Sequence, residues 1–373
     1  MWNHLPFDLL ANIFSFLAPD SLARASSACR HWHTCVTAYP LAVAPSESQR
    51  HPAWFVAMPT RNRGLCCYAH NPIGDSWHVL PLDFLPAPVR PIAPIGSLLL
   101  SRPTSGTSLQ LAICNIFTRQ YRNLPMLNIT RTNPAVGTVV LDQAQLGPFP
   151  FFRVYVAGGM SEVPRGGASY EPTVEMYDSR RDKWELIGSM PMEFAVRLTV
   201  WTPNESVYSN GILYWMTSAR AYSVMGFDIG TNTWRELNVP MADRLEFATL
   251  VRHNGKLTLV GGTCGGGACV WELDVEDNWG MVEKVPLELG MRFLGGKESW
   301  GSTKCVGGDG VVCLYRDLGS GMVFWREVVD KKGRWEWYWV EGCCFIRGKQ
   351  VQNLPIKGVL LHPNLAPSLF LNN

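Results

Sequence analysis

Short runs of apolar residues, interrupted by glycine and by polar turns, recur from residue 54 onward. The stretch from Val154 to Pro191 shows the unit most clearly, with two short strands separated by Gly158-Gly159 and then Trp184 six residues after Asp178. Runs this short, rich in β-branched and aromatic residues, predict strands rather than helices. The Asp-to-Trp spacing suits a hairpin in which the Asp accepts hydrogen bonds from N–H groups of the turn. The Trp would then pack against a neighbouring sheet.

The same unit recurs along the chain. An Asp or Asn precedes an aromatic residue by five or six positions, in the pairs Asn71–Trp77, Asn115–Tyr121, Asp178–Trp184, Asp228–Trp234, Asp274–Trp279 and Asp330–Trp335. The mean step between the aromatic residues is about 52 residues, and a period near 50 with four short strands per unit is typical of a kelch-type β-propeller. Six such units predict six blades.

The first unit contains only three predicted strands, Trp54–Met58, Leu65–Ala69 and Trp77–Leu80. The last apolar run, at about residues 357–362, follows the sixth unit and belongs to none. Propellers commonly close their ring by lending a strand from one terminus to the other, so we predict that this run completes the first blade. The alternative is a frayed C-terminal tail. The long step from 121 to 184 predicts an insertion within residues 126–150 or 160–170.

Residues 1 to 40 follow a helical pattern instead. Apolar side chains stand at i, i+3, i+4 and i+7, at Leu10, Ile13, Phe14 and Leu17. We expect Pro19 to end this helix and Asp20 to cap the next one. Three short helices in 40 residues cannot bury all their apolar side chains against one another. The sequence therefore predicts a helical unit with an unfinished apolar surface, open to a partner or to packing on the propeller.

The run from Leu5 to Leu17, followed by Ser21–Ala25 and Ala28–Trp32, resembles the F-box family. Ala28 departs from the pattern, since family members usually carry a larger aliphatic residue there. In that family the motif docks onto a Skp-type adaptor, which links it to a cullin scaffold. The resemblance implies that adaptor contacts come from Leu5, Pro6, Leu9, Leu10, Ile13, Phe14, Leu17, Leu22 and Trp32.

These patterns predict a mainly β chain, with a three-helix F-box domain at 1–42, a linker at 43–53 and a six-bladed kelch-type propeller at 54–373. By resemblance, such a chain is the substrate receptor of a cullin-based ubiquitin ligase: the helices hold the adaptor and the propeller holds an unidentified target protein. No catalytic residue is expected, because ubiquitin transfer would lie in other subunits. Fusions of this kind are abundant in plants, which suggests a plant source. Two alternatives stay open, an F-box module that binds a partner without a cullin and a propeller that binds or converts a small molecule.

Charge and cysteine content narrow the function classes further. The net charge is only +2 and no Lys/Arg run exceeds two residues, which argues against nucleic acid or an anionic membrane as partner. The cysteine count of 11 is odd, the spacings are irregular, and no signal-peptide pattern is present. Reduced thiols in the cytoplasm or nucleus are the expectation.

Three patterns could indicate sites of chemistry. The glycine-rich run 261–267 precedes a strand rather than a helix and lacks the Lys of a phosphate-binding loop, which favours a kelch glycine turn. The histidines are scattered and no Cys-x-x-Cys occurs, so neither a metal site nor a cofactor is expected. The alternation of Trp335, Trp337 and Trp339 places them on one strand face, which favours packing between blades over a stacking platform for a ligand.

Overall fold

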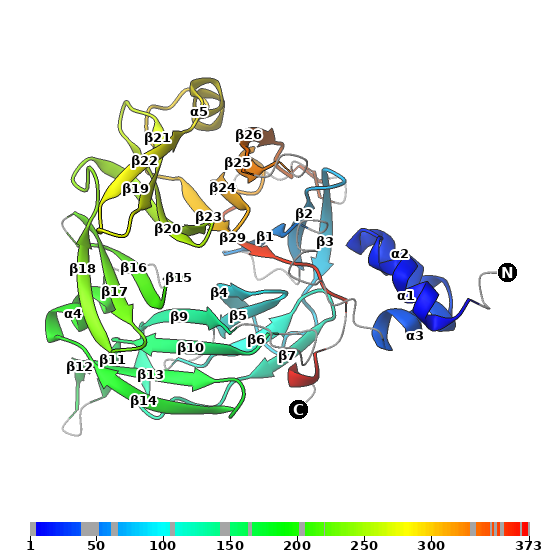
Figure 1. Ribbon diagram of the computed structural model, residues 1–373, viewed down its shortest axis with the longest axis horizontal. Helices are drawn as coiled ribbons and strands as arrows, with labels where there is room; N and C mark the ends of the chain where they lie inside the picture. The colour runs from blue at the N-terminus through cyan, green and yellow to red at the C-terminus, as the bar shows by residue number, and fades with distance from the viewer. Residues whose placement is uncertain are drawn as a thin grey trace.

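Strand pairing in the computed structural model divides most of the chain into six four-stranded antiparallel sheets set around a ring (Figure 1). The structure describes residues 5–38, 52–60, 66–104, 109–141, 150–162, 166–200, 206–219, 221–328, 333–343, 345–346, 349–350, 354–365 and 368–371. The six sheets are the blades of a β-propeller, which confirms the predicted fold class. Three helices precede them.

Each blade runs from an inner strand at the centre of the ring to an outer strand at its rim. In that order, blade 1 contains β29 (Ile356–Leu361), β1 (Trp54–Pro59), β2 (Cys66–Asn71) and β3 (Ser76–Pro81). Blade 2 contains β4 (Val89–Ile95), β5 (Leu98–Pro103), β6 (Ala112–Asn115) and β7 (Gln120–Asn123). Blade 3 contains β9 (Ala135–Val140), β10 (Phe152–Ala157), β13 (Thr173–Asp178) and β14 (Lys183–Ser189).

The second half of the ring follows the same order. Blade 4 contains β15 (Ser206–Ser209), β16 (Ile212–Ser218), β17 (Tyr222–Asp228) and β18 (Thr233–Asn238). Blade 5 contains β19 (Leu245–His253), β20 (Lys256–Thr263), β21 (Ala268–Leu273) and β22 (Trp279–Lys284). Blade 6 contains β23 (Lys304–Gly308), β24 (Val311–Tyr315), β25 (Met322–Glu327) and β26 (Trp335–Val340).

The ring closes through the two ends of the propeller. β29 pairs antiparallel with β1 over six residues, from Trp54 opposite Leu361 to Pro59 opposite Ile356. This is the pairing predicted for the C-terminal run. The inner strands contact one another in the circular order β29, β4, β9, β15, β19, β23 and back to β29. The described part of the ring therefore has no open seam between its first and last blades.

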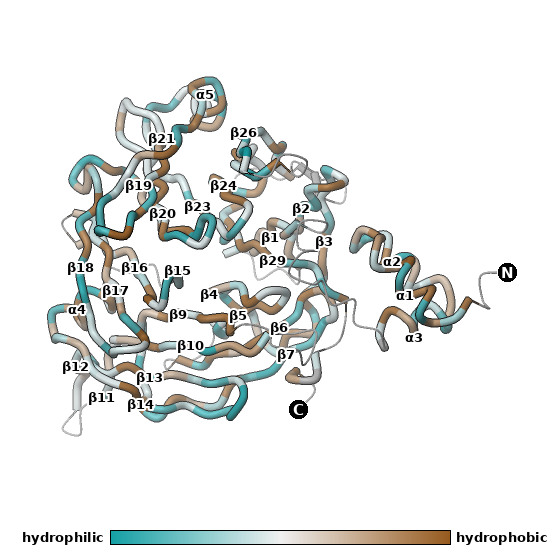
Figure 2. The backbone as a smooth tube through the Cα atoms, in the orientation of Figure 1, coloured by the Kyte–Doolittle hydropathy of each residue, from teal (hydrophilic) through white to brown (hydrophobic). Residues whose placement is uncertain are grey.

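Apolar side chains are buried between the blades. Six hydrophobic clusters each combine residues from two neighbouring sheets, including one shared by blades 6 and 1. Figure 2 shows hydrophobic segments running through the strands, with hydrophilic residues at many of the turns. The repeated aromatic residues each enter a different interface, with the preceding blade: Trp77, Tyr121, Trp184, Trp234, Trp279 and Trp335. The predicted packing of these side chains on neighbouring sheets is confirmed.

The polar half of the repeat forms the turns. Asp228 Oδ1 accepts hydrogen bonds from the backbone N–H groups of Gly230 at 2.9 Å and Thr231 at 3.0 Å. Equivalent bonds are made by Asn71, Asn115, Asp178 and Asp274. The sixth turn begins at Asp330, which lies outside the described residues. These bonds satisfy N–H groups that the tight turn would otherwise leave unpaired, as the Asp-to-Trp spacing predicted.

The pairs Gly158-Gly159 and Gly261-Gly262 are required for different reasons. Gly158 and Gly159 have φ angles of 69° and 95°, a left-handed conformation that glycine adopts without steric cost. Gly262 lies within β20, where a Cβ atom would stand 2.7 Å from the Trp300 ring. The first pair therefore makes a turn, and the second allows close packing. The glycine-rich run that follows Gly262 connects two strands, as expected for a kelch turn.

Consecutive connections alternate between the two faces of the ring, because the strands of each blade are antiparallel. One face, the turn face, has the short hairpins, including the turns that begin at Asn71 and Asp228. The opposite face, the loop face, has the longer connections. These contain α4 (Met192–Val200), α5 (Leu287–Leu294), the hairpin β27 (Phe345–Ile346) and β28 (Lys349–Gln350), and the small sheet β8 (Arg131–Thr132), β11 (Met160–Glu162) and β12 (Ala168–Tyr170). Part of the predicted insertion is this small sheet.

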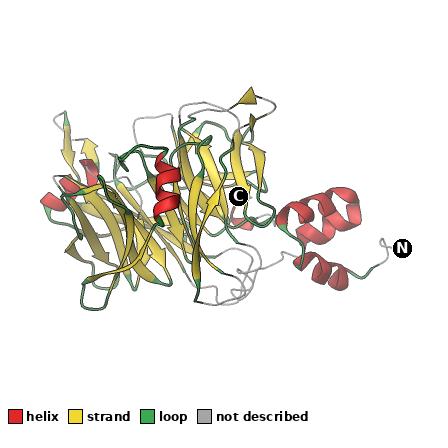
Figure 3. Ribbon diagram, turned by 90° about the horizontal axis from the view of Figure 1, so that it is seen from above, coloured by secondary structure: helices red, strands yellow, loops and turns green. Residues whose placement is uncertain are grey.

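The N-terminal helices are α1 (Phe7–Ser15), α2 (Pro19–Ala28) and α3 (Arg30–Ala38), and they lie beside the ring (Figure 3). Two predicted boundaries are wrong: α1 ends before Pro19, which instead opens α2, and Asp20 pairs with Arg24 at 3.0 Å rather than capping the helix. A proline fits the first helical turn because its missing N–H has no partner there anyway. Residues 43–51 of the predicted linker lie outside the described residues.

Candidate protein-interaction surfaces

Helix α1 is apolar on two sides, about 100° apart around its axis. Leu10 and Phe14 are almost fully buried and form one cluster with Leu22, Cys35 and Val36 from the other two helices. On the other side Leu9, Ile13 and Phe16 are 49%, 43% and 63% exposed, at the i, i+4 and i+7 spacing of one helix face. A helix that is hydrophobic all round is normally buried all round. The second side is therefore an apolar surface that the described chain leaves about half in solvent.

The nine side chains predicted to contact an adaptor divide into three groups. Leu10, Phe14 and Leu22 are buried, so they hold the helices together and offer almost no contact surface. Leu5, Leu17 and Trp32 are half-buried at the edge of this core. Pro6, Leu9 and Ile13 are exposed. Phe16 is more exposed than Leu9 or Ile13 and was missed, although its spacing from them could have identified it.

The C-terminal segment connects the helices to the ring. Leu365 packs against the helical cluster. Just before Leu365, the chain is bound to the turn face of blade 2: His362 N–H donates to Gly96 O at 3.3 Å, and Asn115 Nδ2 donates to Asn364 O at 3.4 Å. The segment ends in the short helix η3 (Leu369–Leu371), which packs beside β7. The helical domain is thus attached at the turn-face end of β29, and the loop face lies at the opposite ends of these strands.

The loop face is the more elaborate side of the ring, and it contains two open hollows. One, of about 640 Å³, lies beside α4 and is lined by Arg197, Tyr222 and Met241 among others. The other, of about 620 Å³, lies between blades 5 and 6 and is lined by Lys297, Thr303 and Arg316 among others. Both have volumes within the range of small-molecule or side-chain pockets. Their openness to solvent suits a surface that receives part of another macromolecule.

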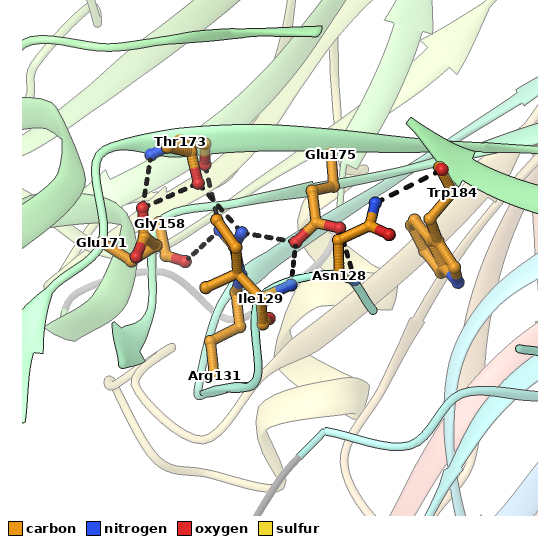
Figure 4. Close-up of polar contacts among 8 residues, drawn as sticks. All are labelled: Asn128, Ile129, Arg131, Gly158, Glu171, Thr173, Glu175 and Trp184. Carbon is orange, nitrogen blue, oxygen red and sulfur yellow. Dashed lines mark hydrogen bonds and ion pairs between the residues drawn. The ribbon is translucent and has the colours of Figure 1, made fainter. Parts of the chain in front are cut away.

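A buried ion pair fixes one loop of this face to blade 3 (Figure 4). The side chains of Arg131 and Glu175 are fully buried, with Nη2 and Oε1 2.7 Å apart. Arg131 also donates to the carbonyls of Gly158 at 3.1 Å and Thr173 at 3.0 Å. Glu175 accepts from the backbone N–H groups of Asn128 at 2.8 Å and Ile129 at 3.1 Å. With both charged groups so fully engaged, the pair is structural, and no sequence pattern predicted it because its members are far apart in the chain.

The tryptophan run 335–339, considered above as a possible ligand platform, has a structural role. Trp335, Trp337 and Trp339 pack into the interface between blades 5 and 6, with Trp325 and Trp337 stacked at 5.5 Å between ring centroids. Packing between blades, the favoured interpretation of this run, is confirmed.

Among the described residues, no group of three or more His, Cys, Asp or Glu is placed to hold a metal ion. None of the described helices is long and apolar enough to cross a bilayer.

Comparison with known proteins agrees with this geometry. A family model described as F-box-like matches residues 2–39, and one described as Kelch motif matches residues 153–191. The chain therefore combines an F-box-like segment with a Kelch motif. The Kelch match covers the unit from β10 to β14, including the Gly158-Gly159 turn and Trp184.

Curated proteins that are similar to this chain share most of its length at low identity. F-box only protein 6 of Arabidopsis thaliana is 22% identical over 94% of this chain and 72% of its own length. Protein UNUSUAL FLORAL ORGANS of Arabidopsis thaliana is 21% identical over 92% of this chain and 79% of its own. Among solved structures, TolB from Acinetobacter baumannii aligns with a TM-score of 0.47 and 10% identity, over 88% of this chain and 70% of TolB.

Proposed function

We propose that this F-box/kelch protein is the substrate-recognition subunit of a Skp–cullin–F-box ubiquitin ligase. The observation that carries the proposal is the second apolar side of α1, where Leu9 and Ile13 are close to half exposed. Fully covering one such side chain gains about 1.5–3 kcal/mol relative to full exposure. A partner helix or groove that covers both recovers part of this, after the cost of association.

The described structure supports separate binding roles for the helical domain and the ring. The helical domain would bind the adaptor through the exposed side of α1, together with Pro6 and the half-buried Leu5 and Trp32. The ring would hold the target protein. Because the two surfaces belong to one chain, binding both partners raises the effective concentration of the target's lysines near the ubiquitin carrier.

This role asks for no active site in the chain itself. The conspicuous buried charged groups, Arg131 and Glu175, are occupied by the hydrogen bonds of their own loop. Ubiquitin transfer would be performed by other subunits of the complex. The cytoplasm or nucleus, where such ligases act, is the proposed location.

The decisive experiment is co-precipitation of the full chain with a Skp-type adaptor and a cullin. The double variant Leu9→Asp/Ile13→Asp places two charges on the exposed side of α1 and should lose the adaptor without unfolding the ring. The matched control is Leu287→Asp/Met291→Asp on α5, a second pair of exposed apolar residues at i and i+4, 77% and 64% exposed. This control should retain the adaptor.

The outcomes separate the candidate functions. Retention of the adaptor by Leu9→Asp/Ile13→Asp would contradict the proposed contact surface. Wild-type protein that captures the adaptor but never a cullin would favour a protein-binding role outside the ligase. With a proteasome inhibitor present, a target should bind both wild type and the α1 variant, and should accumulate in cells that express the variant.

A further inference from the structure

Basic side chains gather on the loop face of blades 6, 1 and 2, where the inner strands begin. We name this group the basic arc, and its members are Lys297, Lys304, Arg316, Lys357, Arg90 and Arg102. Three members line the hollow of about 620 Å³ between blades 5 and 6, and the other three line a crevice of only about 10 Å³, so a ligand group would lie over the Arg90 and Arg102 side chains rather than inside the crevice. The residues that line the two come together at the start of β29. There Lys304 Nζ donates to the carbonyl of Ile356 at 2.6 Å, and Ile356 directly precedes Lys357.

The arc contains a like-charged pair that no described acidic side chain compensates. Arg90 on β4 and Arg102 on β5 are directly opposite one another in the strand register, an arrangement that destabilises a sheet. Lys357 lines the same hollow. Within the described part of the chain, neither arginine has an ion-pair partner, and no acidic side chain lines this hollow. Burial, and then the charge of Arg90, lower the pKa of Arg102.

The other end of the arc holds a third arginine that is not neutralised by a carboxylate of the described chain. Arg316 donates to the carbonyl of Leu294 at 3.4 Å and lies over the Phe293 ring, while its Nε has no partner in the described structure. Asp317 is the acidic residue of this hollow, but it already accepts bonds from Ser320 and Gly319 within its own turn. An anion from outside the chain would meet the basic donors of this hollow beside one carboxylate that is already engaged in its own turn.

We propose that the basic arc binds an acidic peptide segment of the target protein, with a carboxylate or phosphate group of that peptide held between Arg90 and Arg102. This deepens the proposed function and rests on it for the identity of the ligand as a target protein. A guanidinium pair that presents two forks of N–H donors suits either oxyanion, since both accept bidentate hydrogen bonds. Anion binding would offset the cost in stability of placing two arginines opposite each other.

Binding can be measured on the full chain with fluorescently labelled peptides. Hexaglutamate is the carboxylate probe, a peptide of alternating phosphoserine and glycine is the phosphate probe, and hexaglutamine is the uncharged reference. We expect at least one acidic probe to bind, more weakly as salt rises, and hexaglutamine not to bind. Arg90→Glu and Arg102→Glu should each weaken binding by about tenfold or more.

Two controls distinguish loss of the binding site from unfolding and from a general loss of positive charge. Arg102→Glu should raise the melting temperature while it weakens binding, because the new carboxylate pairs with Arg90 across the strands. The matched control is Arg181→Glu, an exposed arginine at a turn-face hairpin, which should bind the acidic probe as wild type does. Equal binding of hexaglutamate, phosphopeptide and hexaglutamine, or wild-type binding by Arg102→Glu, would overturn the proposal. Tighter binding of a DNA oligonucleotide of the same length would overturn it too, in favour of a nucleic-acid surface.

Failure of the basic-arc proposal can be distinguished from failure of the proposed ligase role. Arg90→Glu and Arg102→Glu should co-precipitate the adaptor normally, and Leu9→Asp/Ile13→Asp should bind the acidic probe normally. If the wild-type chain binds the acidic peptide but does not bind the adaptor, the ligase role is rejected and the ring remains an anion-binding surface. Adaptor binding without acidic-peptide binding would reject only the basic arc.

Discussion

The helical domain and the ring bury apolar residues in opposite ways. In the ring each sheet is covered on both sides by its neighbours, and six clusters between blades close a circle. The helical domain has one small cluster, and α1 keeps an apolar side largely exposed. A closed array has no terminal surface left to cover, whereas three short helices always do. The difference lies in one apolar side of α1 that the described fold leaves open, which is the surface proposed to bind the adaptor.

Removal of the closing strand should have the largest effect. Deletion of residues 355–373 removes β29, which pairs with β1 along its whole length and contributes Val359 and Leu361 to the core between blades 1 and 2. The ring should lose its cooperative thermal unfolding, followed by circular dichroism and tryptophan fluorescence. A truncated protein with wild-type melting would show that closure does not stabilise the ring.

Breaking the buried ion pair should cost less than opening the ring. Glu175→Gln leaves the buried Arg131 charge without its carboxylate, and removal of one partner of such a pair costs about 3–5 kcal/mol. Arg131→Met/Glu175→Met should recover only part of this loss, since the carbonyls of Gly158 and Thr173 lose their donor. Denaturant unfolding of the three proteins measures the ranking, and a single variant as stable as wild type would contradict it.

Neighbouring leucines in α1 test the contrast within one helix. Leu10 is 1% exposed and Leu9 is 49% exposed. Leu10→Ala should destabilise the helical domain by about 2–5 kcal/mol, as for other core truncations. Leu9→Ala should change stability by less than about 0.5 kcal/mol and should weaken only adaptor binding. Hydrogen exchange of the helical amides, paired with adaptor affinity, separates the two effects; equal destabilisation by both variants would contradict the two-sided picture.

The smallest expected effect is a pH dependence specific to the ring. Burial of His70 between β1 and β3 lowers its pKa by more than the carboxylate of Asp75, 3.0 Å away, raises it. The folded state therefore prefers the neutral imidazole, and stability present above the ordinary histidine pKa is lost as the pH falls below it. Wild type should be less stable at about pH 5.5 than at about pH 7.5, and His70→Gln should narrow this difference. An unchanged difference in the variant would assign the acid sensitivity to other groups.

Much of the fold could be predicted because each repeat contains its own turn residues and its own packing aromatic residue. The step from Asp228 to Trp234 encodes both a turn and the aromatic side chain that packs against the preceding blade. The incomplete first unit and the unassigned C-terminal run led to the pairing of β29 with β1. The proposed interaction surfaces could be predicted from the sequence only in part. Burial of Leu10 beside exposed Leu9 depends on how α1 rotates against α3, and the pairing of Arg90 with Arg102 depends on strand register.

The sequence by itself determined the number of blades, the strands that build them and the presence of an apolar helical module, because turn chemistry and apolar periodicity act over a few residues. Tertiary structure decided which side of α1 stays exposed, which distant residues form the Arg131–Glu175 pair, and which basic residues meet on the loop face. Those outcomes depend on contacts between segments tens to hundreds of residues apart. No local pattern specifies them, since a single step in helix rotation or strand register would exchange a buried side chain for an exposed one.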